Sequence, residues 1–339
     1  MAGDSPLRVG IVGTGRIATD HIVVLRKLGH EIVAVCDIDR ARAEQGEPKG
    51  AAVYEDWREL LDRETLHALW VTTPPLHHRG PATAAMAGGL PVFLEKPVAR
   101  TLEDARVIVE TWERTGVVCA VGYQWHASEG LETLQAELAG QRIALLLGVS
   151  VGPTAARPWF LDRSSGGGNI LERGSHQLDL MRAVTGDVAR VQVTASETLL
   201  AQTETDPGNI EDAATLLLQF ENGAVGTVVI AWTRHGQPAT YSLDVVATEA
   251  TLKLELDPAF MVSGQVGDRR VRTSLTTHPF ERAIARFVEA VHARDPGRVF
   301  CDPRDAMATL ATALACERSL LESGRAVELT ELLSPVKSM

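Results

Sequence analysis

One short glycine motif constrains the fold of this 339-residue chain more than any other feature. Gly13-x-Gly15-x-x-Ala18 directly follows an apolar run over residues 7–12 and opens a helical pattern that continues to Gly29. A second apolar run ends at Asp37, 19 residues after Ala18. A strand, a tight turn, a helix and a second strand ending in an acid are the parts of a dinucleotide-binding βαβ unit.

Each part of this motif has a physical task in binding a dinucleotide. Gly13 permits the tight turn, Gly15 lets backbone amides approach the pyrophosphate, and the small Ala18 lets helix and strand pack closely. Asp37 would accept hydrogen bonds from the adenosine ribose and repel a 2′-phosphate, so we expect NAD rather than NADP. Arg40 could instead shield such a phosphate or stack on adenine, or be a solvated surface residue.

The first third of the chain repeats this alternation of strand and helix patterns. Short runs rich in branched residues lie at 31–36, 68–72, 92–95 and 118–121, separated by segments with a helical pattern. Such an alternation predicts a parallel sheet with helices on both faces. We therefore expect an α/β Rossmann domain over residues 1–124.

The remainder of the chain has a different character, with long apolar runs that follow one another. Asn222-Gly223 falls between two of them and predicts a type I′ hairpin, whose two central residues both need positive φ. Helical patterns begin at Pro279 and at Pro303, the second after a capping Asp302. We expect an α+β domain over residues 125–339 with a large, mainly antiparallel sheet that is open on one face.

Composition limits the class of protein and of partner. A chain of 339 residues exceeds the size at which one core usually keeps growing, which agrees with two domains. The formal net charge of −11 disfavours binding to nucleic acid or anionic membranes. No apolar run reaches the roughly 18 residues of a membrane span, and no secretory signal is recognisable. We expect a cytoplasmic protein with reduced, dispersed cysteines.

The clearest functional signal lies in "LWVTTPPLHHRGPATAAMAGGLPVFLEKPVA", residues 69–99. This segment resembles the signature of the Gfo/Idh/MocA oxidoreductases, the family of glucose-fructose oxidoreductase and inositol 2-dehydrogenase. The resemblance extends over nearly the whole chain and includes Glu95-Lys96-Pro97, "GGGNILERGSHQLD" and "ENGAVGT". It implies an NAD(P)-dependent dehydrogenase that moves hydride between the nicotinamide and a secondary hydroxyl or ketone of a sugar, cyclitol or polyol derivative.

Three residues carry the chemistry that this resemblance implies. Lys96 would lie beside the nicotinamide and stabilise charge on the reacting oxygen, with a cis bond to Pro97 fixing its direction. His176 is the candidate base for oxidation and acid for reduction, because histidine ordinarily titrates near neutral pH. Glu172, where many members have aspartate, lies four residues earlier and would share a helix face with His176.

Glycines surround this helix. Gly166 to Gly168 could let the backbone bend close to a ligand. Gly174 inside the helix costs about 1 kcal/mol relative to alanine, which a close approach by substrate or nicotinamide would explain. Asp179 could start a metal site with Glu172 and His176, but no further ligands are recognisable nearby, so no metal is expected.

The remaining contacts are expected from their positions in these segments. His126 stands where arginine is frequent in the family, and His78 has no family counterpart and is expected at the surface. Tryptophans near the site could stack on a sugar ring or serve as plain packing. The expected cofactor contacts are Gly13, Gly15, Arg16, Ile17, Ala18, Asp37, Arg40, Thr73, Pro74, His77, Glu95 and Lys96, and the expected substrate contacts are Tyr123, Trp125, Trp159 and Asp162.

Two other functions fit the same motifs. One is a non-catalytic NAD-binding regulator, against which the presence of both Lys96 and His176 argues. The other is a glycoside-cleaving enzyme that retains its NAD and uses transient oxidation. As partners we expect a small sugar or polyol, neither nucleic acid nor membrane, and further copies of the chain in a homodimer or homotetramer built on the second-domain sheet.

Overall fold

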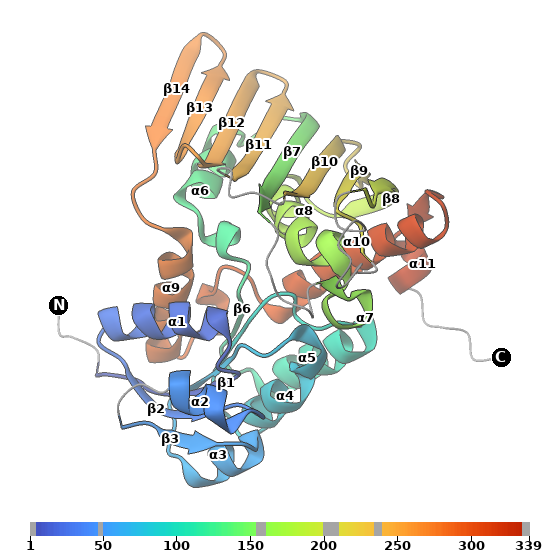
Figure 1. Ribbon diagram of the computed structural model, residues 1–339. Helices are drawn as coiled ribbons and strands as arrows, with labels where there is room; N and C mark the ends of the chain where they lie inside the picture. The colour runs from blue at the N-terminus through green and yellow to red at the C-terminus, as the bar shows by residue number, and fades with distance from the viewer. Residues whose placement is uncertain (1–4, 47–49, 154–160, 199–209, 234–238, 334–339) are drawn as a thin grey trace. The chain divides into compact units, whose positions relative to one another are not determined.

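The computed structural model describes residues 5–46, 50–153, 161–198, 210–233 and 239–333 (Figure 1). The chain forms two compact units, one joining residues 1–127 to 278–307 and the other joining 128–277 to 308–339. The division expected from the sequence, which assigns every residue after 124 to the second domain, does not include this return to the first unit. No helix in the described ranges has both the length and the apolar character needed to cross a bilayer.

The first unit is built on a six-stranded parallel sheet in the order β3-β2-β1-β4-β5-β6. The order reverses between β1 and β4, which is where sheets of this kind bind ligands. The expected Rossmann domain is confirmed, and it contains one strand, β3, that was not predicted. The elements are β1 (Arg8–Val12), α1 (Arg16–Lys27), β2 (Glu31–Cys36), α2 (Arg40–Gly46), β3 (Ala52–Tyr54), α3 (Trp57–Arg63), β4 (Ala68–Val71), η1 (Pro75–His77), α4 (Arg79–Ala87), β5 (Val92–Leu94), α5 (Leu102–Thr115), β6 (Cys119–Val121) and η2 (Gln124–Ala127).

Helix α9 (Pro279–Ala293) completes the core of the first unit, followed by the short η5 (Pro296–Arg298). Its apolar face includes Ile284 and Phe287, which are fully buried among residues of the parallel sheet. The Phe287 ring meets Trp70 of β4 and Phe93 of β5 edge to face, at centroid distances of 5.0 and 5.5 Å. Aromatic pairs of this geometry add about 0.5–1.5 kcal/mol beyond their area burial. The late segment therefore joins the first unit because it fills that unit's core.

The second unit contains a nine-stranded sheet in the order β14-β13-β12-β11-β7-β10-β9-β8-β15. Only β7 and β10 pair in parallel among these described strands, so the expected mainly antiparallel α+β fold is confirmed. The elements are α6 (Glu129–Glu137), β7 (Ile143–Pro153), α7 (Arg163–Gly166), the π-helical η4 (Ile170–Gly174), α8 (Ser175–Thr185), β8 (Val188–Ser196), β9 (Ala213–Phe220), β10 (Val225–Thr233), β11 (Thr240–Ala247), β12 (Ala250–Asp257), β13 (Met261–Val266), β14 (Arg269–Ser274), α10 (Pro303–Leu321, which begins in the first unit), β15 (Val327–Glu328) and α11 (Thr330–Leu333).

The hairpin between β9 and β10 is confirmed, but its expected turn type is wrong. A three-residue loop, 221–223, connects the strands, and Phe220 N donates to Ala224 O at 2.9 Å across its base. Gly223 has φ 90°, whereas Asn222 is not among the positive-φ residues and its side chain accepts a bond from Ala224 N. A left-handed glycine at the end of a three-residue loop is a common hairpin geometry.

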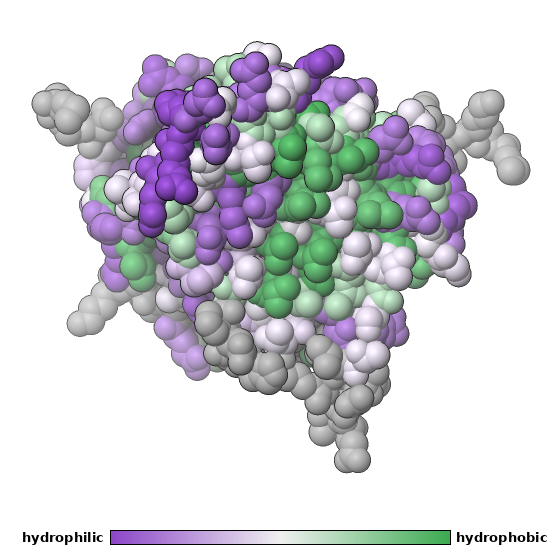
Figure 2. All heavy atoms as spheres, turned by 90° about the horizontal axis from the view of Figure 1, so that it is seen from above, coloured by the Kyte–Doolittle hydropathy of each residue, from purple (hydrophilic) through white to green (hydrophobic). Residues whose placement is uncertain are grey.

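One face of the nine-stranded sheet carries exposed apolar side chains. Buried and exposed residues alternate along β7, β9 and β10, as in a sheet with one covered face. Helices α6 and α8 lie on the covered side (Figure 1). Leu147, Leu217, Val225 and Val229 are 39–50% exposed. Figure 2 shows hydrophobic residues gathered over this region and bordered by hydrophilic ones.

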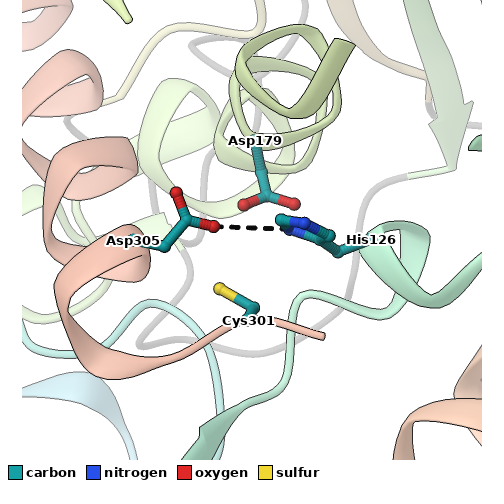
Figure 3. Close-up of side chains that lie close together, drawn as sticks. All are labelled: His126, Asp179, Cys301 and Asp305. Atoms are coloured by element: carbon teal, nitrogen blue, oxygen red, sulfur yellow. Dashed lines mark ion pairs between the residues drawn. The ribbon is translucent and has the colours of Figure 1, made fainter. Parts of the chain in front are cut away.

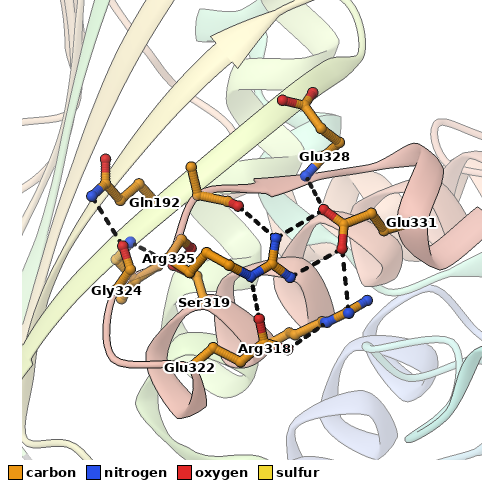
Figure 4. A network of polar contacts seen from close by, with 10 residues as sticks. Gln192, Arg318, Ser319, Glu322, Gly324, Arg325, Glu328 and Glu331 are labelled. Carbon is orange, nitrogen blue, oxygen red and sulfur yellow. Dashed lines mark hydrogen bonds and ion pairs between the residues drawn. The ribbon is translucent and has the colours of Figure 1, made fainter.

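A network of charged groups fixes the end of the second unit (Figure 4). Arg325 donates to Glu322 and to both carboxylate oxygens of Glu331. Glu331 also accepts a bond from Glu328 N at 3.1 Å. The hydrogen bonds from Arg325, followed by that from Glu328, lower the pKa of Glu331 to about 2. This network holds α11 against the turn that leads into β15.

Candidate active site

The glycine turn lies between β1 and α1, at the carboxyl end of the parallel sheet. Gly13 has φ 94°, and a Cβ at this position would lie 2.7 Å from the backbone of Thr72 and Thr73. A Cβ on Gly15 would meet none of its described neighbours within 4 Å. The turn therefore packs tightly on one side and leaves room at the amino end of α1, where backbone amides favour an anion. These residues fit a dinucleotide pyrophosphate.

Asp37, at the end of β2, is held beside this turn. Its Oδ2 accepts bonds from the backbone and hydroxyl of Thr14, at 2.9 and 3.0 Å. Its Oδ1 accepts a bond from Asp39 N at 3.0 Å. Only 7% of Asp37 is exposed, so the carboxylate is fixed in position at the strand end, where the sequence predicted an acid for the adenosine ribose.

Two arginines of α2 follow Asp37 closely in the chain, and they have different partners. Arg40 pairs with Glu44 and Glu55, whereas Arg42 lies 3.3 Å from Oδ1 of Asp37. Both arginines lie on α2, and chain distance alone favoured the nearer Arg40. Arg42 was missed because the rotation of this short helix decides which side chain faces the carboxylate.

Glu95 and Lys96 follow β5, and the Lys96-Pro97 bond is cis, as the resemblance implied. Glu95 is 8% exposed and accepts a bond from the backbone N of Lys96 at 3.1 Å. Its other oxygen lies 2.8 Å from Nε2 of His21, which is fully buried. A Cβ on Gly122, after β6, would lie 3.0 Å from the Glu95 carboxylate, so glycine leaves the space that this side chain occupies.

His21 is a site residue that the sequence reasoning missed. Its ring packs against Phe93 and Phe280, at centroid distances of 5.2 and 4.6 Å. Burial alone would raise the pKa of Glu95, but the hydrogen bond and charge of His21, together with the charge of Lys96, outweigh burial and lower it. The available signal was a lone histidine within the apolar stripe of α1.

The loop after β4 contains His78, whose burial differs from the sequence expectation. Pro74 precedes η1, His77 is exposed, and His78 is fully buried, so the expectation of a surface His78 was wrong. The ring nitrogens of His78 lie 2.8 Å from Thr73 O and 3.4 Å from Val98 O. Burial lowers the pKa of His78. The tight turn of η1 directs one histidine outward and the next inward, where it connects the loops after β4 and β5.

The other first-unit residues differ in burial. Arg16 and Ile17 open α1, with the Arg16 side chain exposed, while Ala18 is 1% exposed and packs in the core. Tyr123 is also 1% exposed, whereas Trp125, in η2, is half-buried. Of these two expected substrate contacts, only Trp125 therefore presents part of its side chain at the surface.

The expected acid and base lie on two consecutive helices of the second unit. Glu172 lies in η4 and His176 in the first turn of α8, and both are half-buried. Single π-helical turns next to α-helices occur frequently at functional sites. A Cβ on Gly174 would lie 3.5 Å from Ile230, an ordinary contact, so packing within the unit does not require glycine there.

The glycines before η4 make room for a buried glutamate. A Cβ on Gly168, which has φ 80°, would lie 2.9 Å from the Glu211 carboxylate. Glu211 is fully buried and accepts bonds from Ile170 N at 2.7 Å and from Arg163 at 2.8 Å. Burial raises the pKa of Glu211, although Arg163 and the backbone donors act in the opposite direction. Gly168 therefore serves a contact inside the protein.

Asp162 caps the short helix α7. Its carboxylate accepts bonds from the backbone N and hydroxyl groups of Ser164 and Ser165. These bonds use both of its oxygens, and its expected contact with substrate hydroxyls stays a prediction. Trp159 lies outside the described residues.

Comparison with known proteins agrees with this arrangement. Residues 7–123 match the oxidoreductase family with an NAD-binding Rossmann fold, and residues 146–253 match the GFO/IDH/MocA C-terminal domain. The chain is 28% identical to D-apiose dehydrogenase of Paraburkholderia graminis, covering 95% of this chain and 89% of that protein. It is 26% identical to D-xylose 1-dehydrogenase (NADP(+)) 2 of Haloferax volcanii, covering 94% and 99%.

A solved structure of levoglucosan dehydrogenase in complex with NADH shares the fold, with a TM-score of 0.83 and 19% identity over 96% of this chain and 99% of that one. Both halves of the sequence thus match one family, and the glycine turn and the Glu95-Lys96-Pro97 strand end are in place in the structure. The chain belongs to the Gfo/Idh/MocA family of oxidoreductases and carries its NAD-binding Rossmann fold.

Proposed function

We propose that this protein is an NAD-dependent dehydrogenase acting on a secondary hydroxyl, or the corresponding ketone, of a sugar, cyclitol or polyol derivative. The observation that carries the proposal is the position of Lys96, which a buried carboxylate holds at the carboxyl end of β5 in a sheet that also presents a glycine turn. The bound cofactor would accept hydride from the alcohol carbon as NAD, or supply it to the ketone as NADH. The names of the relatives, D-apiose and D-xylose dehydrogenases, support a carbohydrate substrate.

Lys96 stabilises negative charge on the reacting oxygen. Hydride leaves an alcohol carbon more easily as the hydroxyl loses its proton, and a nearby ammonium lowers the energy of the developing alkoxide. Glu95 accepts a bond from the Lys96 backbone, and His21 in turn contacts Glu95. Glu95 and His21 are therefore positioning residues that fix where the lysine side chain begins.

His176 takes the hydroxyl proton during oxidation and returns it during reduction, and Glu172 orients the histidine or the substrate. Proton transfer by a positioned side chain contributes about 10²- to 10⁴-fold in rate. The sequence spacing and the family resemblance support these two roles, and the structure adds that both side chains are half-buried rather than sequestered in the core.

NAD is preferred to NADP because of the carboxylate of Asp37. A 2′-phosphate placed near this buried acid would meet like charge. Arg42, whose side chain is 52% exposed, offsets part of that charge, and one relative is named for NADP(+). Steady-state kinetics with both cofactors test this choice. A kcat/KM for NADP equal to or above that for NAD would contradict it.

The exposed apolar face of the second unit is proposed as the contact between copies of the chain. Leu147, Leu217, Val225 and Val229 lie on neighbouring strands of the open face (Figure 2). Contiguous apolar surface of this kind marks an interaction site. Light scattering of the wild type should give a dimer or tetramer, and Val229→Lys should lower that mass. A monomeric wild type would contradict this part of the proposal.

NADH absorbance with a panel of inositols, aldoses, ketoses and acid or amino sugars, in both directions, tests the activity. We expect turnover on one ring stereoisomer. Silence across the panel, with tight NAD binding by calorimetry, would contradict the dehydrogenase.

Replacement of Lys96 tests the role of the strand end. Lys96→Ala should lower kcat by about 10²-fold or more, the usual cost of removing a group that stabilises an oxyanion, while NAD affinity stays near the wild-type value. Lys27→Ala is the matched control, because that lysine is exposed and pairs with Glu281 on the surface. Unchanged turnover in Lys96→Ala would contradict the assignment.

A further inference from the structure

Three side chains with metal-binding atoms converge in the first unit, apart from the glycine turn and from Lys96. His126 lies in η2 after β6, Cys301 lies just before α10, and Asp305 lies in the first turn of α10. One ligand atom from each lies within 4.8 Å of the others, and His126 Nδ1 is 3.5 Å from Asp305 Oδ2. Figure 3 shows the imidazole, the thiol and the carboxylate directed toward a common point.

From this geometry we propose that His126, Cys301 and Asp305 form a binding site for a divalent transition metal ion, with Zn²⁺ as the best match. Zinc binds imidazole nitrogen, thiolate sulfur and carboxylate oxygen at about 2.0–2.3 Å, so tetrahedral ligand atoms lie roughly 3.3–3.7 Å apart. The His126–Asp305 separation already falls in that range. The other ligand atoms lie within 4.8 Å of one another, so side-chain rotations of about 1 Å would bring them into the same range.

The mixed donor set selects the class of ion. Mg²⁺ and Ca²⁺ prefer all-oxygen sites, whereas one nitrogen, one sulfur and one oxygen suit zinc or its spectroscopic substitute Co²⁺. These three ligands leave the fourth tetrahedral position to another ligand. On binding, the Cys301 thiol gives its proton to solvent and the thiolate bonds to the metal.

The backbone holds each ligand in place before any metal arrives. Val121 N, at the end of β6, donates to Cys301 O at 2.9 Å. His126 N donates to Tyr123 O at 3.0 Å, and Asp305 N donates to the Asp302 side chain at 2.9 Å. Fixed ligands lower the ordering cost of binding.

Access and charge also favour a cation. Cys301 is 2% exposed, while the side chains of His126 and Asp305 are 17% and 33% exposed, so an ion can enter from solvent and then contact the buried sulfur. Asp302 adds a second carboxylate at the same helix start. A bound ion would fasten the chain leaving β6 to the segment that returns before α10, which makes its role structural rather than part of hydride transfer.

Titration of the chelator-washed full-length protein with Co²⁺ tests this proposal. We expect one equivalent to bind, with thiolate-to-cobalt charge-transfer absorption in the near ultraviolet that Zn²⁺ displaces. Cys301→Ser should abolish that absorption and weaken metal binding by at least about 100-fold, since even the loss of an outer-shell partner costs 10- to 100-fold. Cys119→Ala is the matched control, because Cys119 is a buried thiol of β6 outside the cluster.

Thermal unfolding supplies a second readout that does not depend on activity. Zn²⁺ at about 100 times its Kd should raise Tm by roughly 5 °C in the wild type and in Cys119→Ala. The rise should be absent in Asp305→Asn and His126→Gln, which keep side-chain size and serve if Cys301→Ser does not fold. Failure to bind one equivalent, or the same cobalt spectrum and Tm rise in all variants, would overturn the site.

Discussion

Two buried glutamates, one in each unit, respond to burial in opposite ways. Glu95 and Glu211 each lie 2.8 Å from a basic side chain, yet the pKa of Glu95 is lowered and that of Glu211 is raised. His21, beside Glu95, is fully buried, and Lys96 adds charge. Arg163, beside Glu211, is 15% exposed and also lies 4.0 Å from Glu317.

The difference shows what keeps a buried carboxylate ionised. A hydrogen-bond partner is most effective when it is buried with the carboxylate, since competition and screening by water are then weak. An arginine that is partly solvated and divided between two acids offsets less of the cost of burial. The carboxylate beside the proposed catalytic lysine therefore stays charged, and the one beneath the glycine run takes up a proton more readily.

Replacing the basic partner of each glutamate should give the largest difference in stability between the two sites. His21→Ala leaves an ionised Glu95 buried without that partner, and we expect a loss of about 3–5 kcal/mol in the free energy of unfolding. Arg163→Ala should cost less, about 1–3 kcal/mol, because Glu211 can protonate and keeps its bond from Ile170 N. Urea denaturation at pH 7 measures both.

The control for these variants is His21→Gln, which retains a hydrogen-bond donor and should recover part of the stability. The exposed His77→Ala should be near neutral. Equal losses for His21→Ala and Arg163→Ala would remove the distinction between the two glutamates.

Adding a methyl group beside each carboxylate should cause the next largest loss of stability. Gly168→Ala combines a positive φ with a Cβ 2.9 Å from Glu211, and we expect it to cost about 1–3 kcal/mol. Gly122→Ala, whose Cβ would lie 3.0 Å from Glu95, should cost about 1 kcal/mol and lower kcat by moving Glu95 and hence Lys96.

Gly116→Ala is the matched control for backbone strain, because Gly116 has φ 65° but no described neighbour within 4 Å of its Cβ position. Denaturation and steady-state rates distinguish the effects. A Gly168→Ala variant no less stable than Gly116→Ala would show that the Glu211 contact contributes nothing.

The pH dependence of stability should have opposite signs at the two sites. Glu95 has a folded-state pKa below 4.5, so its carboxylate adds stability above pH 4.5 that is lost as pH falls through the folded pKa. Glu211 has a folded-state pKa above 4.5, so its contribution declines as pH rises from 4.5 through that value.

Glutamine variants test this dependence of stability on pH, because an amide mimics the protonated acid at every pH. Relative to the wild type, Glu95→Gln should lose stability as pH rises through the lowered pKa of Glu95 toward 4.5, and Glu211→Gln should gain stability as pH rises above 4.5. Denaturation at several pH values is the measurement, and slopes of the same sign would contradict the assignment.

The smallest change in stability is expected for the exposed network around Arg325 (Figure 4), because water screens its charge pairs. Glu331 has a pKa of about 2, so its bonds with Arg325 stabilise the fold above pH 4.5 and are lost as pH falls toward 2. Glu331→Gln should lower Tm only slightly, and 1 M NaCl should remove the difference. A large, salt-independent loss would show that the network is shielded from solvent.

Local patterns were sufficient to predict much of the fold. The glycine turn, most strands of the parallel sheet and the apolar face of α9 all follow from spacing within about fifteen residues. The type I′ turn failed because the Asn222 side chain bonds Ala224 N, a competition that composition does not reveal. The return of α9 to the first unit depended on aromatic packing against Trp70 and Phe93, which periodicity does not specify.

The candidate site was predictable only where one short segment contains it. Lys96 and the glycine turn were found by motif, whereas His21 acts on Glu95 across 74 positions. His78 was misplaced because one step along η1 changes which side chain faces inward. The contact of Gly168 with Glu211 was not predicted, because the two residues lie far apart in the chain.

The packing of α9 sets the order in which the units can be completed during synthesis. Phe287 fills the core between Trp70 and Phe93, so the first unit lacks part of its interior until α9 leaves the ribosome. At about 5–20 residues per second, α9 emerges roughly 8–30 seconds after Ala127. The parallel sheet must therefore wait, with aromatic surface exposed, for a helix that follows β14 in the chain.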